Sequence, residues 1–309
     1  MQHHKTKHYL FVLLKVAIVV IAFFVIYTRL AQDDFSFHDF IRVLKLYDVL
    51  SFTPLCCFLL FSIANWGIEF LKWQSFVASV RKINFKESIQ QSLGAQTLAF
   101  ITPNRIGEYG AKALFYPKTK RKSIFEMTFF HNAHQLLATV IFGIVGLVLL
   151  QKWLWLSIIL GVISIGICIV LMLKKQAIKG YTLQELWKHY VQIPPKNRNL
   201  NFLFSILRYL IFAHQFYFVL QFFQVEITYL NTMSCIASMY ILASFVPAIS
   251  IFDVVIKAGV AVVLFGAFGV NDWIVLTTST LLFLGNMAIP ALFGSYVVWN
   301  FNTKTEVVC

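Results

Sequence analysis

The clearest candidate for binding chemistry is a short polar segment that follows a proline inside an apolar stretch. Pro103 is followed by Asn104, Arg105 and Gly107. Because proline lacks a backbone donor and clashes with the preceding turn, we expect a helix to break here. The half-helix that restarts would present backbone N–H groups and a guanidinium to an anion, such as a lipid phosphate. The structural alternative is a simple kink in which Arg105 pairs with Glu108.

Two acid–lysine pairs stand four residues apart, a spacing that places both members on one helix face. They are Glu108 with Lys112, and Asp253 with Lys257, which follows a second proline, Pro247. Charges within apolar segments are expensive and mark functional sites by default. Self-pairing within the helix is the structural alternative, because it lowers that expense without any ligand.

A later apolar run carries a polar stripe at helical spacing, with His134 beside it. The stripe comprises Thr128, His131, Asn132, Gln135 and Thr139. It should face a cavity or a partner helix, and His131 and Gln135 are candidates for headgroup contact. The spacing His131-x-x-His134 is weak as a metal motif, because two ligands without a nearby carboxylate-rich partner are too few. We therefore predict no metal and no cofactor.

Arg208 lies within another apolar run, one to two turns from one end. Glu69 occupies a similar depth in an earlier run. Two interpretations remain open: a Glu69–Arg208 pair that ties the halves of the chain together, or an arginine that extends to a lipid headgroup.

The composition of the chain indicates that these residues lie in a membrane protein. The 309-residue chain is 59% hydrophobic and only 13% charged, whereas a soluble domain carries about 25% charged residues. Soluble enzymes, secreted disulfide scaffolds and disordered chains are therefore excluded. The net charge of +13 reflects topology and not nucleic-acid binding, because Lys and Arg collect in cytoplasmic loops.

Six runs are long enough to span a bilayer: about 10–30, 51–71, 124–150, 153–173, 201–223 and 273–299. Most of the Lys and Arg residues fall in segments 72–86, 116–123 and 174–200 or near the two ends. The positive-inside rule then places both termini in the cytoplasm, with the chain in the cytoplasmic (inner) membrane.

Two further stretches, about 88–115 and 232–270, contain a proline and charges near their middles. The charge distribution makes each one start and end on the same side. We therefore predict two oppositely oriented re-entrant hairpins in an all-α membrane domain of residues 1–309, with inverted pseudo-repeat halves of about 1–150 and 151–309. No segment is expected to form a soluble catalytic domain.

The first hairpin resembles a known family. The stretch Thr102-Pro103-Asn104-Arg105-Ile106-Gly107-Glu108 is similar to the Pro-x-x-x-Gly-Glu signature of the lysylphosphatidylglycerol synthase transmembrane region, also called the flippase-like domain family. The segment Glu69-Phe70-Leu71-Lys72-Trp73 resembles the basic-aromatic end of an early helix in that family. The second hairpin lacks the glycines usual there. The resemblance implies a membrane domain that accommodates lipids and flips them between leaflets, without the aminoacyl-transferase activity of the full-length synthases.

The sequence thus favours flippase-like translocation of an anionic or phosphate-containing lipid. The expected partners are membrane lipids and a separately encoded lipid-modifying enzyme, with no nucleic acid. The alternative is a membrane-embedded enzyme or accessory subunit acting on a lipid- or polyprenyl-phosphate headgroup, with Glu108 or His131 as general acid or base. An interaction scaffold is a third interpretation.

Overall fold

The computed structural model describes residues 37–102, 105–173, 182–246 and 250–301, and all regular structure in these ranges is helical. The elements are α2 (Phe37–Leu46), α3 (Phe52–Val77), α4 (Phe85–Ile101), α5 (Ile106–Leu114), α6 (Arg121–Leu149), α7 (Trp153–Leu173), α8 (Leu183–Gln192), α9 (Pro195–Phe222), α10 (Tyr229–Ser244), α11 (Ser250–Gly266), α12 (Asp272–Phe283), the π-helix η1 (Leu284–Ala288) and α13 (Ile289–Trp299).

Within the described ranges, five helical segments are long and apolar enough to cross a membrane, as in a multi-pass membrane protein. They are α3, α6, α7, α9 and the continuous segment α12–η1–α13, and they match five of the six predicted runs. The sixth, 10–30, lies outside the described residues. Two boundaries differ by six residues: α9 begins at Pro195, and α3 continues to Val77. Lys72, which the sequence pattern places in a loop, is therefore buried inside α3.

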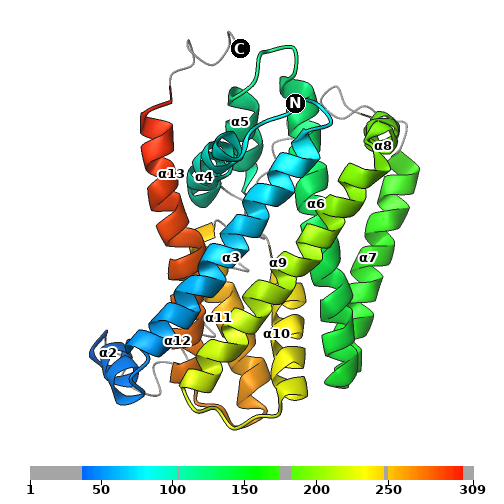
Figure 1. Ribbon diagram of the computed structural model, residues 1–309. Helices are drawn as coiled ribbons and strands as arrows, with labels where there is room; N and C mark the ends of the chain where they lie inside the picture. The colour runs from blue at the N-terminus through cyan, green and yellow to red at the C-terminus, as the bar shows by residue number, and fades with distance from the viewer. Residues whose placement is uncertain (1–36, 103–104, 174–181, 247–249, 302–309) are drawn as a thin grey trace, which may run out of the picture.

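The helices form one bundle in which α3 and α9 pack along each other, α6 packs on α9 and α10, and α13 packs on α4. Figure 1 shows α4, α5 and α8 towards one end of this bundle and α2, α10 and α11 towards the other. Helix α7 packs on α6 at the edge and exposes most of its apolar residues, as expected of a lipid-facing helix.

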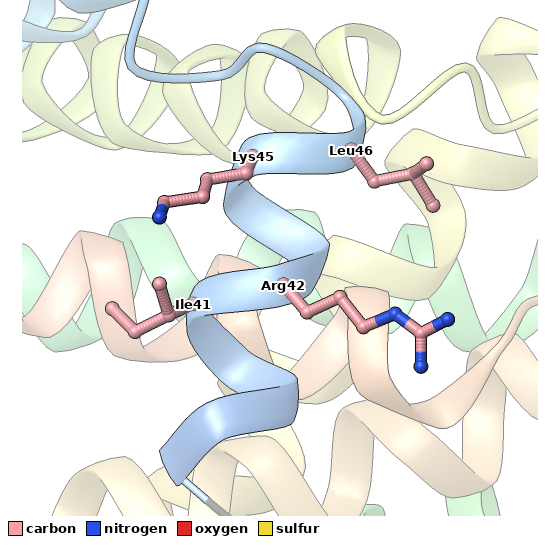
Figure 2. Close-up of a pocket in the computed structure, with 4 residues that line it drawn as sticks. All are labelled: Ile41, Arg42, Lys45 and Leu46. Carbon is pink, nitrogen blue, oxygen red and sulfur yellow. The ribbon is translucent and has the colours of Figure 1, made fainter.

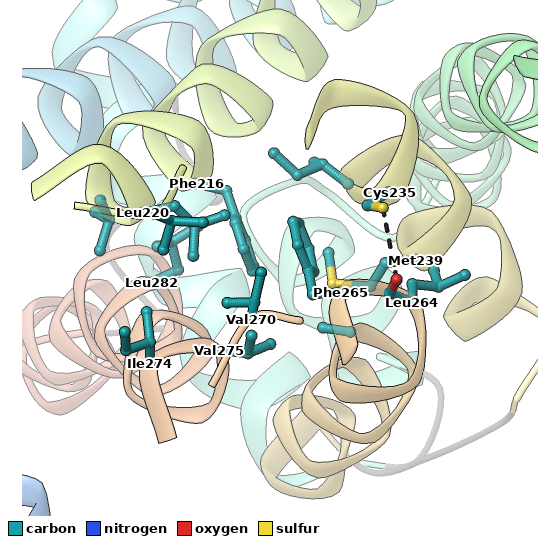
Figure 3. Packing of buried hydrophobic residues seen from close by; sticks show 14 of the residues in the cluster. Phe216, Leu220, Cys235, Met239, Leu264, Phe265, Val270, Ile274, Val275 and Leu282 are labelled. Carbon is teal, nitrogen blue, oxygen red and sulfur yellow. Dashed lines mark hydrogen bonds between the residues drawn. The ribbon is translucent and has the colours of Figure 1, made fainter. Parts of the chain in front are cut away.

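The largest apolar core lies between α9, α10, α11 and α12 (Figure 3). Phe216 stacks on Phe265 with ring centroids 6.0 Å apart. Cys235 directs its thiol to the carbonyl of Leu264 at 3.8 Å. Because this half of the bundle is filled by apolar side chains, it is a packed support and not a cavity.

Two helical pairs are interrupted where the sequence has prolines. Helix α4 ends at Ile101 and α5 begins at Ile106, while α10 ends at Ser244 and α11 begins at Ser250. Both members of each pair pack against one another. The close packing of α13 on α4 requires Gly294, because a Cβ there would lie 1.9 Å from the carbonyl oxygen of Leu93.

Candidate functional site

The α4–α5 junction is built by local backbone features that fix the position of Arg105. Arg105 is the N-cap of α5 and has a left-handed backbone, with φ of 57°. A non-glycine residue in this region is uncommon and is held there by its surroundings. Gly107 donates its backbone N–H to Thr102 Oγ1 at 2.8 Å. A Cβ on Gly107 would lie 2.3 Å from the carbonyl oxygen of Leu98, so only glycine permits this approach.

Glu108 is the first buried carboxylate of the site and has three partners. Lys112 Nζ lies 3.0 Å from its Oε1, and Arg105 contacts its Oε2 through Nε and Nη2 at 3.3 Å. Asn132 of α6 donates to the same Oε2 at 3.3 Å. The Arg105–Glu108 and Glu108–Lys112 pairs, which the sequence offered as the structural alternatives to a ligand site, are both present, and Glu108 joins α5 to α6.

Glu69 is the second buried carboxylate and joins three other helices to α3. Arg208 Nη1 lies 2.7 Å from its Oε2, and His131 Nε2 lies 2.9 Å from its Oε1. Lys112 Nζ approaches Oε1 at 4.0 Å. Of the two interpretations that the sequence left open for Arg208, the structure shows the pair with Glu69, and Arg208 is also held inside the protein by a 3.0 Å bond from its Nε to Asn65.

Two lysines are completely buried at the same place. The ammonium of Lys112 sits 4.1 Å from the ring centre of Trp73, a cation–π contact that is strongest away from water. Lys72 donates to Gln135 Oε1 at 3.4 Å. Its charge faces Glu69, Glu108, Arg208 and Lys112, and no carboxylate lies within ion-pair distance of it among the described residues.

We call these six residues the core charge cluster: Glu69, Lys72, Arg105, Glu108, Lys112 and Arg208. Four cationic side chains face two carboxylates, and with neutral histidines the cluster carries an excess of positive charge. Arg105 is the most exposed member, with 39% of its side chain accessible, and Arg208 follows with 21%. The cluster is therefore a cationic site whose accessible edge is Arg105.

The π-helix η1 supports both arginines of the cluster. Asn286 Oδ1 accepts from Asn65 at 2.8 Å, and Asn65 in turn accepts from Arg208. Arg105 Nη1 contacts Met287 Sδ at 3.8 Å. Irregular turns of this kind inside helices are frequent at functional sites, and here one turn fixes residues that contact both arginine arms.

A divalent metal fits this arrangement poorly. Glu69, Glu108 and His131 each offer a ligand atom, and these atoms lie within 4.8 Å of one another. However, Lys112 and Arg208 already neutralise the two carboxylates, and Lys72 adds a further positive charge. A cation placed among them would be repelled, so the donor set favours an anionic ligand.

The structure brings together seven of the predicted site residues. Arg105, Glu108, Lys112 and Arg208 belong to the cluster, His131 and Gln135 contact it, and Gly107 lies between Arg105 and Glu108 in the first turn of α5, where it bonds to Thr102. Pro103, Asn104 and Pro247 lie outside the described residues. The remaining pair, Asp253 and Lys257, is present, with Lys257 Nζ 2.6 Å from Asp253 Oδ2. The ammonium of Lys257 also lies over the ring of Tyr240, and the pair is separate from the core charge cluster.

A separate, open surface pocket lies on α2, lined by Ile41, Arg42, Lys45 and Leu46 (Figure 2). Helix α2 precedes the beginning of α3, whereas Glu69 and Lys72 lie near the end of α3. This pocket is therefore distinct from the core charge cluster, and Arg42 and Lys45 are exposed.

Sequence reasoning missed several members of the site. The sequence pattern places Lys72 in a loop, and it does not single out the amides Asn65 and Asn286, or Asn201, which contacts His131. The available signal was helical spacing: Asn65, Glu69 and Lys72 recur every three to four residues and share one face of α3. Asn286 has no comparable signal, because its position depends on the π-turn.

Comparisons with protein-family models, with curated proteins and with solved structures found no match to this chain. The interpretation of the site therefore depends on its own geometry: two buried lysines, two buried carboxylates and two partly exposed arginines within a multi-pass helical bundle.

Proposed function

We propose that this chain is a lipid-handling membrane protein of flippase type that moves an anionic or phosphate-containing lipid between leaflets. The observation that carries the proposal is the excess of cations in the core charge cluster. A charge at the centre of a spanning helix costs about 2.5–3.5 kcal/mol on insertion scales. Retaining Lys72 and Lys112 fully buried against too few carboxylates is most simply explained by an anion that completes the cluster.

The chemistry of the donors favours a phosphate-bearing headgroup. Arginine binds phosphate through two parallel N–H donors, while lysine supplies a compact point charge. Arg105 is the accessible member, so it would meet the headgroup first. Lys112, Lys72 and Arg208 would then stabilise the negative charge deeper in the bundle, while the acyl chains stay among the exposed apolar side chains of the spans.

The alternating-access part of the proposal uses the two broken pairs. In it, α4–α5 and α10–α11 are re-entrant hairpins from opposite faces, related as inverted repeats, with both termini in the cytoplasm. Their placement towards opposite ends of the bundle (Figure 1) and the acid–lysine pair after each break support this. The cluster uses only the first hairpin, so the two hairpins would have different roles. The proposal agrees with the resemblance to the lysylphosphatidylglycerol synthase transmembrane region.

A second candidate is a membrane-embedded enzyme or accessory subunit acting on a lipid-phosphate headgroup. It is favoured by the 2.9 Å contact between His131 and Glu69, a pairing that general acid–base catalysis uses. Lipid mass spectra of a deletion strain distinguish the two. A missing lipid species supports the enzyme, whereas an unchanged inventory with altered leaflet distribution supports the transporter.

The direct test is translocation of fluorescent phosphatidylglycerol in proteoliposomes, with dithionite quenching to count outer-leaflet probe. Arg105→Gln should slow translocation at least tenfold, because it removes the accessible cation. Arg42→Gln is the matched control, since Arg42 is exposed on α2 away from the cluster. If the wild type moves the probe no faster than protein-free vesicles, the transporter proposal is wrong.

A further inference from the structure

A chain of hydrogen bonds leads from the core charge cluster to the short helix α8. His131 and His134 lie one turn apart on α6, and the side-chain amide of Asn201 bridges their Nδ1 atoms. The other nitrogen of His131 contacts Glu69 Oε1 at 2.9 Å, and that of His134 contacts the hydroxyl of Tyr190 at 2.9 Å. Both nitrogens of both rings are therefore engaged, which restricts where protons can reside.

In the structure, the side-chain amide of Asn201 is oriented with Oδ1 towards His131 and Nδ2 towards His134. An amide oxygen only accepts, and Glu69, paired with Arg208, also only accepts. His131 must then donate from both nitrogens, which makes it an imidazolium. His134 accepts at Nδ1, so when neutral it carries its proton on Nε2 and donates to Tyr190.

Rotating the Asn201 amide by a half-turn gives a second, equally satisfied arrangement. Amide nitrogen and oxygen occupy nearly the same volume, so the rotation needs no extra space. Asn201 then donates to His131, which is neutral and gives its remaining proton to Glu69. His134 donates to the amide oxygen and accepts from the hydroxyl of Tyr190. The two arrangements differ by one proton on His131 and by the direction of every bond out to α8.

The charges around His131 determine which arrangement is favoured. It is faced by Glu69 and Lys72 from α3, Glu108 and Lys112 from α5, and Arg208 from α9, with His134 on its own helix. These groups carry more positive than negative charge, so they oppose a proton on His131. An anion bound in the cluster offsets that excess, because it supplies negative charge, and so favours a proton on His131.

We propose that His131 takes up one proton when an anionic headgroup occupies the core charge cluster, so that lipid binding and proton binding are coupled. This inference rests on the proposed function for its ligand. Coupling is reciprocal: a proton on His131 strengthens headgroup binding by the same factor that the headgroup strengthens proton binding. With one proton linked, the affinity for the headgroup falls by up to tenfold per pH unit in the interval between the titration of His131 in the empty cluster and its titration in the occupied one.

The coupling also has a consequence at α8. Proton uptake reverses the hydrogen bond between His134 and Tyr190, so His134 becomes its donor. Tyr190 packs on Phe130 with ring centroids 4.9 Å apart and contacts Trp187, which is exposed. The occupied and empty cluster therefore present different hydrogen bonding to a helix that carries an exposed aromatic residue.

Isothermal titration calorimetry of the full chain in detergent tests the coupling. The probe is dihexanoyl phosphatidylglycerol, with dihexanoyl phosphatidylcholine as the net-neutral comparison. Titrations between pH 5 and pH 8 in two buffers of different ionisation enthalpy give the number of protons taken up per lipid bound. We expect this number to rise towards one within that interval. Phosphatidylglycerol binding with no proton uptake at any pH overturns the coupling and leaves the anion site standing. Equal binding of both lipids, or none, overturns the proposed function instead.

Two variants locate the proton. His131→Gln keeps a donor towards Glu69 but does not titrate, so proton uptake on lipid binding should vanish. His214→Gln is the control and should match the wild type, because His214 contacts Leu210 and Tyr229 away from the cluster. Asn201→Asp places a second acceptor-only carboxylate beside His131 and holds the ring charged beforehand, so uptake should again vanish in a chain that keeps both histidines. If folded His131→Gln or folded Asn201→Asp takes up as many protons per lipid as the wild type, the assignment of the proton to His131 is overturned.

Discussion

Glu69 holds the bundle together, because its carboxylate is where side chains of α5, α6 and α9 meet α3. Glu69→Gln keeps the shape of the side chain and removes its charge. Arg208, Lys72 and Lys112 then face only Glu108. Removing one partner of a buried ion pair costs about 3–5 kcal/mol, since it leaves an uncompensated charge. Arg208 retains 21% side-chain exposure, so we expect the lower end, about 3 kcal/mol.

This loss is measurable as a shift in thermal unfolding of the detergent-solubilised chain. An unfolding entropy of about 2.1 cal/mol/K per residue corresponds to about 1.5 °C per kcal/mol for a chain of 309 residues, so Glu69→Gln should lower the apparent melting temperature by about 4–5 °C. Glu226→Gln is the matched control, because Glu226 is exposed between α9 and α10. It should unfold within 2 °C of the wild type.

A double-mutant cycle isolates the ion pair from the rest of the cluster. Arg208→Met alone removes the partner 2.7 Å from Glu69 Oε2, and the double variant removes both charges. We expect a coupling of about 1–3 kcal/mol, because contacting residues are not additive. Additivity within about 0.5 kcal/mol, or a Glu69→Gln chain as stable as Glu226→Gln, would refute the idea that this pair ties the helices together.

Three further predictions concern the elements around the cluster. In the same melting assay, Gly107→Ala should destabilise the chain by about 1–3 kcal/mol, because its Cβ would lie 2.3 Å from a backbone carbonyl oxygen of α4. Gly110→Ala on the same helix is the control: its Cβ meets nothing within 4 Å, so this variant should be neutral or stabilising. Asn84→Ala removes the capping side chain at the start of α4 and should lower the free energy of unfolding by about 1 kcal/mol. An unchanged denaturant midpoint for this variant would contradict the role of the cap. The backbone N–H and hydroxyl of Thr182 hold the pKa of Glu185 below its ordinary value. The stabilisation of α8 by this cap is therefore fully present at a pH above the ordinary carboxyl pKa, and it is lost as the pH falls through the lowered pKa of Glu185. Amide-exchange protection of the first turn of α8 should decline over that interval and be low at every pH in Thr182→Ala.

Part of the site could be predicted from sequence because it depends on spacing along one helix. Glu108 and Lys112 pair within α5, and Asp253 and Lys257 pair within α11, by helical geometry alone. The Glu69–Arg208 contact was predictable in outline, since two opposite charges at a similar membrane depth have few other partners. The separation of Asp253 and Lys257 from the cluster was not predictable, because it depends on how α11 rotates against α10 and α4.

Composition and periodicity alone indicate an all-helical, multi-pass membrane chain, because an apolar surface of this extent is stable in lipid and a continuous apolar run of about 20 residues satisfies its backbone there as a helix. They also determine where the spans lie, since span length follows from bilayer thickness. Tertiary structure alone decided that Lys72 belongs to the site and not to a loop, that Asn286 supports Arg208 through a π-turn, and that one amide bridges two histidines. The physical reason is that burial of a charge or an amide is decided by partners on other helices, and those partners are distant in sequence.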